Sequence, residues 1–225
     1  MPACTHILKG KEGQLVKLEQ IRGVYDGAFS LGSKCLAAIQ LREYGLRPCS
    51  GVLDWMLSPS LPHVCLLHEL RFQNFMSPSN LTFIEREGGE QLLYDLNYEI
   101  TLVHDLALNL NSMKHDLNAY PFFHQKLIRR ITRFLQICNS GYRLLFVRLH
   151  GSMDEAYRLQ SALSNLVRGS FHILLINDGV NFEIVEEPCP SEHICAIRMP
   201  LEVEVKPLWD EVLRGITLSN AIKFH

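Results

Sequence analysis

The sequence predicts an α/β fold in three layers, with a mostly parallel sheet flanked by helices. Three unbroken apolar stretches, at residues 142–149, 171–176 and 193–199, are typical of strands that are buried on both faces. Helical patterns lie between and after these stretches, at 153–167 and 207–213. Strands that alternate with helices usually form a parallel sheet, so we expect that architecture for the second half of the chain.

The first part of the chain is predicted to add one buried strand and two helices. An apolar stretch at 25–31 is followed at once by a helical pattern at 35–44, and Gly45 is a typical helix stop. A loop at 48–58 then leads to an amphipathic helix at 62–72. We therefore expect a strand–loop–helix unit in which the loop after the strand leads straight into the helix.

The middle of the chain is predicted to hold a hairpin and the longest helix. Two apolar-alternating pieces within 81–95 flank a polar turn at 86–90, as in a β-hairpin, and a further strand at 98–109 runs into a loop. Apolar residues recur at helical spacing through 120–138. That helix also has a basic flank, which consists of Lys126, Arg129, Arg130 and Arg133.

Length and composition favour one globular domain without nucleic-acid or membrane partners. A chain of 225 residues is predicted to form a single α/β domain over 1–225, with residues 1–23 as an N-terminal arm. The net charge of −2 and the pI near 6.5 argue against nucleic acid and anionic membranes as partners. No apolar run reaches the roughly 18 residues of a membrane span.

The seven cysteines point to a reducing compartment rather than to disulfides or a metal site. Their number is odd, no Cys-x-x-Cys pair occurs, and their spacings match no recognised metal motif. We expect mostly buried thiols, no metal and no other cofactor. The first residues lack the apolar core of a secretory signal, which also favours the cytoplasm. The sequence leaves the oligomeric state open.

Cys35 is the residue that most directly suggests chemistry. It lies in the first turn of the predicted helix, after a Gly-Ser loop, and a helix N-terminus lowers the pKa of a thiol. The loop is a near miss to a phosphate-binding motif, because Ser33 stands where the lysine should be and Lys34 comes one residue late. We therefore favour covalent chemistry at Cys35 over nucleotide binding.

A cysteine nucleophile needs a base, and a third group to orient that base. Among the ten histidines, His104 stands out because it ends an apolar strand and is followed by Asp105. His150 and His172 flank apolar strands and are interpreted as structural imidazoles. Asp54 lies between Leu53 and Trp55, so we expect it to be partly buried and to have a partner.

Six short segments together resemble a known family. They are Ser30-Leu31-Gly32-Ser33-Lys34-Cys35, Gln40-Leu41-Arg42 with Gly45-Leu46-Arg47, Leu53-Asp54-Trp55, Val103-His104-Asp105, Arg129-Arg130 with Arg133, and Leu145-Phe146-Val147-Arg148. This set is similar to a domain-of-unknown-function family that is described as papain-like cysteine peptidases. The resemblance spans roughly residues 24–215. One departure is Leu53, where the family usually has Phe.

The resemblance implies a thiol-dependent hydrolase that acts on a peptide or small-molecule amide. Cys35 would be the nucleophile and His104 the base, while Asp54 or Asp178 would orient the base better than Asp105, which points to the other side of a strand. Backbone N–H groups of Lys34 and Cys35 would form the oxyanion site. A papain-like α+β fold, with an antiparallel sheet, is the alternative architecture.

A non-catalytic ligand-binding protein is the second hypothesis. The Gly32-Ser33 loop and the arginines would then recognise a small anionic or sugar- or nucleotide-like ligand. Guanidinium groups bind phosphate and carboxylate through paired contacts. The candidates for this role are Arg129, Arg130, Arg133 and Arg148.

Overall fold

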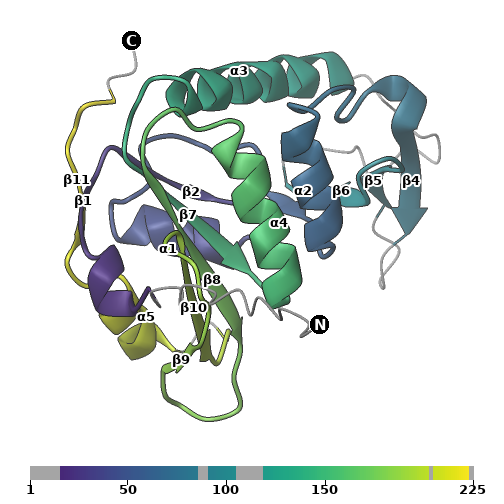
Figure 1. The fold of residues 1–225 in the computed structure, drawn as a ribbon. Helices are drawn as coiled ribbons and strands as arrows, with labels where there is room; N and C mark the ends of the chain where they lie inside the picture. Colours follow the sequence, from purple (N-terminus) through teal and green to yellow (C-terminus); the bar gives the residue numbers. More distant parts are fainter. Residues whose placement is uncertain (1–15, 86–90, 105–118, 203–204, 223–225) are drawn as a thin grey trace, which may run out of the picture.

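A computed structural model describes residues 16–85, 91–104, 119–202 and 205–222, and its centre is a five-stranded sheet (Figure 1). The strand order is β2-β7-β8-β10-β9, and the first four strands are parallel, while β9 pairs antiparallel with β10. The strands are β2 (Gly27–Ser30), β7 (Leu144–Leu149), β8 (Phe171–Asp178), β10 (Ile194–Met199) and β9 (Val185–Glu187). The predicted α/β class with a mostly parallel sheet is thus confirmed.

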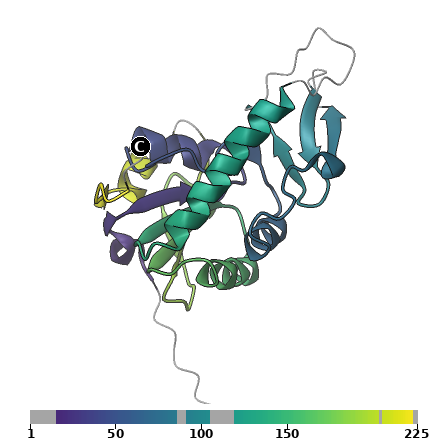
Figure 2. The same ribbon diagram turned by 90° about the horizontal axis from the view of Figure 1, so that it is seen from above.

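Helices cover both faces of this sheet, which gives the three predicted layers (Figures 1 and 2). Alternate side chains of one strand enter two separate cores: Phe146 packs with α2, α3 and α4, whereas Leu145 and Val147 pack with α1 and α5. This alternation is what a strand that is buried on both faces requires. The helices are α1 (Leu36–Glu43), α2 (Leu61–Glu69), α3 (Tyr120–Cys138), α4 (Met153–Ser164) and α5 (Lys206–Val212).

A second, four-stranded sheet lies to one side of the three layers (Figure 2). It is antiparallel throughout, in the order β3-β6-β5-β4, and it contains the predicted hairpin as the pair β4–β5. Its strands are β3 (Met56–Leu57), β4 (Leu81–Glu85), β5 (Gln91–Asp95) and β6 (Ile100–Leu102). The chain therefore combines a mostly parallel sheet with a separate antiparallel one.

The predicted strand at 25–31 is split in two. Most of it forms β2, but Tyr25 belongs to β1 (Gly23–Tyr25), which pairs in parallel with β11 (Ile216–Leu218) instead of joining the central sheet. Asp26 marks the break, because its carboxylate accepts hydrogen bonds from the Arg143 backbone N–H and the Ser219 hydroxyl. A short 3₁₀ helix, η1 (Leu18–Ile21), precedes β1 and buries both Leu18 and Ile21.

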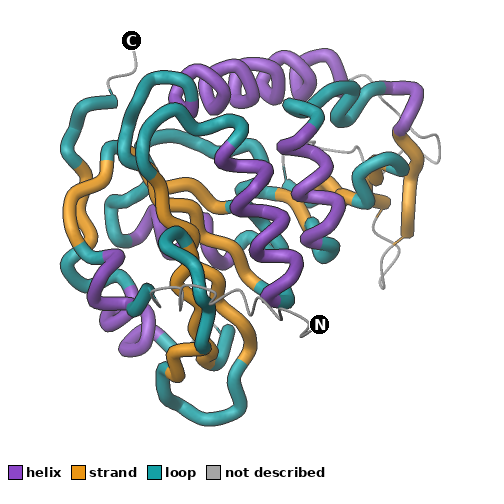
Figure 3. The backbone as a smooth tube through the Cα atoms, in the orientation of Figure 1, coloured by secondary structure: helices purple, strands orange, loops and turns teal. Residues whose placement is uncertain are grey.

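The carboxyl ends of β2, β7, β8 and β10 lie at one edge of the central sheet, where the β8–β9 connection projects as a long loop (Figure 3). In parallel α/β sheets, binding and catalytic sites lie beyond this edge. None of the helices in the described segments is long and apolar enough to cross a membrane.

Candidate functional site

The loop between β2 and α1 holds Cys35 in a fixed position at the carboxyl edge. Gly32 has φ +81°, and a Cβ added there would lie 2.2 Å from Ser58 Oγ, so only glycine lets the loop pack this closely. Ser33 follows with φ 75°; its N–H donates to Ser58 Oγ at 2.9 Å and its carbonyl accepts from the Ser58 N–H at 3.1 Å. Cys35 then forms the N-cap of α1.

The Cys35 thiol is half-buried, and its pKa is higher than the ordinary value rather than lower. Burial is the largest cause of the raised pKa, the negative charge of Asp54 adds to it, and the backbone N–H of Cys35 itself opposes it. The expectation that the helix start lowers the pKa is therefore wrong for the resting protein. At neutral pH the thiol keeps its proton, and a base must remove it during a reaction.

Asp54 is a fully buried carboxylate beside this thiol. Its Oδ2 accepts hydrogen bonds from Arg47 at 2.9 Å and from the Gly51 N–H at 2.7 Å. Within the described chain, Oδ1 accepts no hydrogen bond. Burial raises the pKa of Asp54, whereas Gly51, Arg47 and Arg130 lower it. One carboxylate oxygen thus remains available in the neighbourhood of Cys35.

His104 and Trp55 lie across a hollow from α1. The two rings meet edge to face, with centroids 6.1 Å apart, and the guanidinium groups of Arg42 and Arg47 lie over Trp55 at 5.8 and 5.6 Å. The hollow has a volume of about 380 Å³ and is lined by Ile39, Arg42, Trp55 and His104.

Cys35 belongs to the same face of α1 as this hollow. Ile39 lies one helical turn after Cys35 and donates its backbone N–H to the Cys35 carbonyl at 3.0 Å. Cys35 itself does not line the hollow; the structure brings the charge of Asp54 to Cys35 and places His104 against Trp55, the neighbour of Asp54 in sequence. Asp105, the remaining predicted member of this group, lies outside the described residues.

His150 approaches the loop from the other side, at the end of β7. Its Nδ1 lies 2.9 Å from the Ser33 hydroxyl, and its backbone has φ 60°. Burial is the main cause of its lowered pKa; the positive charges of Lys34 and Arg148 add to this effect, and Asp178 opposes it. Ser33, Lys34 and Asp178, all predicted as site residues, therefore gather around a histidine that the sequence did not select.

Arg148 is a structural residue, and its predicted role in ligand binding is corrected. Its side chain is fully buried and makes five hydrogen bonds, one for each guanidinium N–H. They run to the carbonyls of Leu31, Ser58, Pro59 and His150 and to the Ser58 hydroxyl. Arg148 thus holds together the two loops of the site, and no donor is left for a ligand.

The sequence missed His150, Ser58 and Arg47. The signal for His150 was its place directly after an unbroken buried strand, which puts it at the carboxyl edge. Ser58 gave no such signal, and Arg47 was noted only within a family segment, because the roles of both depend on contacts with Ser33 and Asp54. Over the described ranges, no group of three or more histidine, cysteine or acidic side chains is arranged to hold a metal ion.

Fold and site define an α/β protein with a half-buried cysteine at a helix start, next to a buried carboxylate and two histidines. The chain belongs to the family described as “Putative papain-like cysteine peptidase”, whose model matches residues 26–185. That match includes Cys35, Asp54, His104 and His150. The uncharacterised protein R408 of Acanthamoeba polyphaga mimivirus is 28% identical over 168 residues, which cover 68% of this chain and 74% of that protein. No solved structure matches.

Proposed function

We propose that the protein is a cysteine-dependent hydrolase in which Cys35 attacks the carbonyl carbon of an amide or a related group. The observation that carries the proposal is the hollow beside α1: Cys35 lies on the same helix face as Ile39 and Arg42, and His104 forms part of the opposite wall. Membership of a family described as cysteine peptidases supports the same chemistry.

In this mechanism the thiol proton of Cys35 passes to His104 while sulfur bonds to the carbonyl carbon. The proton then moves from His104 to the leaving amine, the C–N bond breaks, and a thioester remains on Cys35. Water hydrolyses this thioester to release the acid. We assign the stabilisation of negative charge on the carbonyl oxygen to the N–H groups of Lys34 and Cys35 at the start of α1.

Asp54 supports this mechanism through its charge. A buried carboxylate beside the thiol raises the pKa of Cys35, so it favours the protonated resting form. The same negative charge stabilises a neighbouring imidazolium once the proton has left the thiol. Asp54 is thus our candidate for the third member of the site. The charge of Asp178 acts on His150, where it partly opposes the lowering of the pKa by burial. Asp178 is therefore not needed as the third member.

The hollow suits a peptide segment or a small amide as substrate. A volume of about 380 Å³ lies in the range of small ligand sites, and the hollow combines the Trp55 ring with the Arg42 guanidinium. We also propose a cytoplasmic location, because the six cysteines within the described segments are all free thiols, and thiols persist in reducing compartments.

The test is turnover of p-nitrophenyl acetate, an activated ester whose hydrolysis releases coloured nitrophenolate. We expect hydrolysis by the wild type and its loss in Cys35→Ser. His104→Ala should slow the release by about a hundredfold or more, the usual contribution of general acid–base catalysis. Cys49→Ser is the matched control, because Cys49 is also half-buried and also has its pKa raised by Asp54. Equal rates in Cys35→Ser and wild type would refute the proposal.

A ligand-binding protein without catalysis is the second candidate, and one observation favours it. Arg42 and Arg47 both lie over Trp55, so two cations and an aromatic face gather at one edge of the hollow. Such a group suits a small anionic or sugar- or nucleotide-like ligand. Isothermal titration with inorganic phosphate, compared between wild type and Arg42→Gln, distinguishes this candidate, because the hydrolase proposal requires no phosphate binding.

A further inference from the structure

His150 is a second histidine at the carboxyl edge, and the mechanism above does not use it. It is half-buried at the end of β7, with its Nδ1 atom 2.9 Å from Ser33 Oγ. Both residues of this pair have left-handed backbones, with φ 60° for His150 and φ 75° for Ser33. Such conformations are strained for residues other than glycine and concentrate at functional sites.

The backbone of His150 is fixed by two further hydrogen bonds. Its backbone N–H donates to the Ile176 carbonyl at 2.9 Å, and its own carbonyl accepts from Arg148 Nε at 3.2 Å. Within the described part of the chain, the other ring nitrogen, Nε2, has no hydrogen-bond partner. When Nδ1–H donates to Ser33, Nε2 carries the free lone pair, which is the form that a general base requires.

We propose that His150 is the general base that activates the water molecule for release of the acyl group from Cys35, and that Ser33 is its positioning residue. This inference rests on the proposed function of Cys35. In the step, water gives a proton to His150 Nε2 while its oxygen bonds to the thioester carbonyl carbon. The C–S bond breaks, the sulfur leaves as a thiolate, and the imidazolium returns the proton to it. The products are the free thiol and a carboxylic acid.

The position of His150 fits this second step better than the first. Ser33, which holds the ring, lies two residues before Cys35 on the β7 side of the loop, whereas His104 lies with Trp55 along α1. Hydrolysis through a thioester needs a proton acceptor twice, first for the thiol and then for water. The molecule offers two imidazoles on separate elements.

The electrostatic surroundings keep His150 ready to accept a proton. The charged groups that act on it are Lys34, Arg148 and Asp178. Burial together with the two cations outweighs the effect of Asp178 and lowers the pKa of His150 below its ordinary value. The imidazole is therefore neutral at pH 7, and it protonates only at more acidic pH.

The experiment separates acylation from deacylation with p-nitrophenyl acetate. The initial burst of nitrophenolate reports acylation of Cys35, and the steady-state rate that follows reports release of acetate. The test variant is His150→Asn, because asparagine tolerates a left-handed backbone and keeps a polar group near Ser33. We expect a normal burst, a steady-state rate about a hundredfold lower, and accumulated acetyl-enzyme in the intact mass spectrum.

The matched control is His172→Asn. His172 is also half-buried, and its Nδ1 also lies 2.9 Å from a hydroxyl, that of Tyr25, but at the opposite edge of the sheet. We expect this variant to keep both phases of the reaction. A steady-state rate in His150→Asn equal to that of His172→Asn would overturn the inference, and so would loss of the burst in His150→Asn.

Two further measurements guard against a merely structural effect. Ser33→Gly removes the positioning hydroxyl at a site where glycine suits the backbone, and we expect slower deacylation with an unchanged burst. In the wild type the steady-state rate should fall at acidic pH as His150 protonates, and this decline should disappear in His150→Asn. A burst that persists in Cys35→Ser would instead refute the proposed function itself.

Discussion

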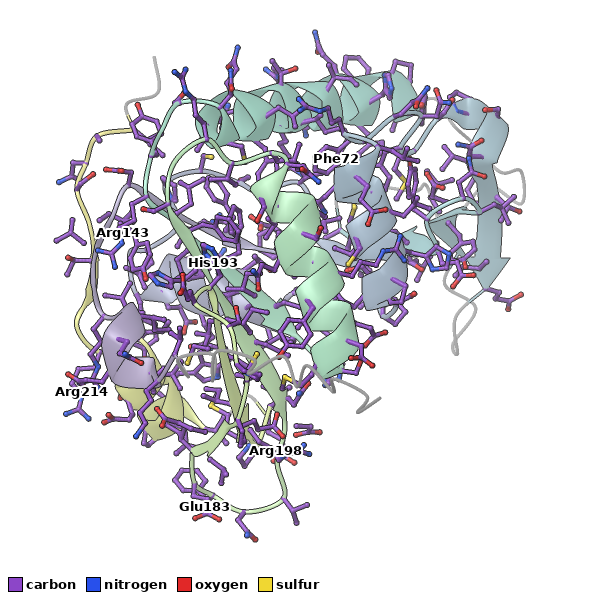
Figure 4. The ribbon with its side chains drawn as sticks, viewed as in Figure 1. Phe72, Arg143, Glu183, His193, Arg198 and Arg214 are labelled. Atoms are coloured by element: carbon purple, nitrogen blue, oxygen red, sulfur yellow. The ribbon has the colours of Figure 1, made fainter. Side chains whose placement is uncertain are left out.

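At each end of the parallel strands of the central sheet, the amino edge and the carboxyl edge, a side-chain hydroxyl contacts an imidazole. The surroundings of the two pairs differ. At the amino edge, Tyr25 holds His172, and at the carboxyl edge Ser33 holds His150, each through a contact of 2.9 Å to Nδ1. Figure 4 marks these two ends of the sheet with Arg143 and His193 at the first and Arg198 at the second.

At the amino edge, the hydroxyl–imidazole pair has ordinary backbone conformations, since neither Tyr25 nor His172 is among the described residues with positive φ. The Tyr25 hydroxyl donates to the Ile21 carbonyl at 2.7 Å, so it must accept from the Nδ1–H of His172, and Arg143 lies 4.5 Å above the Tyr25 ring. At the carboxyl edge, by contrast, both members of the pair have left-handed backbones, and an oxygen of Asp54 lacks a partner in the described chain. Backbone strain within the pair and one unpaired buried carboxylate oxygen thus accompany the edge that holds Cys35, and such strain concentrates at functional sites.

The largest expected effect is on stability, and it comes from replacing Arg148 at the carboxyl edge rather than Arg143 at the amino edge. Arg148→Met should destabilise the protein by about 3 kcal/mol or more, because it leaves four carbonyls near the site without donors. Arg143→Met should cost only about 1 kcal/mol, because Arg143 is half-exposed and its side chain contacts the Val24 carbonyl, at 3.4 Å, and Tyr25. Urea denaturation measures the free energy of unfolding of both variants. Equal losses of stability would contradict the proposed difference between the two edges.

A second expected effect is on stability in acid, and it comes from His68 in α2. Burial lowers the pKa of His68 to about 4, so this imidazole stays neutral in the folded protein while the unfolded chain binds a proton near pH 6.5. Stability must therefore fall as the pH decreases from 6.5 towards 4. Between about pH 7 and pH 5 the loss from His68 is roughly 2 kcal/mol.

Denaturation of wild type and His68→Gln at both pH values isolates this contribution. We expect the variant to lose less stability on acidification than the wild type. His172 at the amino edge should behave in the same direction, because burial and Arg143 lower its pKa to about 4 as well. An identical loss in wild type and His68→Gln would show that His68 is not neutral in the folded state.

The smallest expected effect is a change in the titration of Cys35. Asp54→Asn removes the negative charge that raises the pKa of Cys35, so the rate of alkylation by iodoacetamide should titrate at lower pH than in the wild type. Asp26→Asn is the control at the amino edge, where Asp26 bonds Arg143 and Ser219. A midpoint that rises or stays constant in Asp54→Asn would place the Asp54 charge away from the thiol.

Much of the fold was predictable because it depends on local periodicity. The unbroken apolar stretch at 142–149 and the capped helix after it follow from their own residues, and Ser152 does cap α4 with Glu155. The division at Asp26 was not predictable, because β1 pairs with β11 from the far end of the chain. Pairing between segments so distant in sequence leaves no periodic signal.

The same limit applies to the site. The place of Cys35 at a helix start follows from the adjacent Gly-Ser loop, but the direction of its pKa shift depends on Asp54, which another loop brings beside it. The sequence alone shows Arg148 only as a cation, whereas the fold shows that Leu31, the loop at 58–59 and the His150 carbonyl use all five of its donors. The sequence thus predicted several residues of the site, but not the residues with which each of them forms contacts.

The most direct test of the account is to locate the acyl group after brief reaction with p-nitrophenyl acetate. Acid quenching, proteolysis and mass spectrometry of the peptides identify the acetylated residue, and His150→Asn should make the adduct easier to detect. We expect one acetyl group, on Cys35, that is absent after prior alkylation of Cys35. Acetylation spread over several cysteines, or none on Cys35, would contradict the proposal that this thiol is the nucleophile.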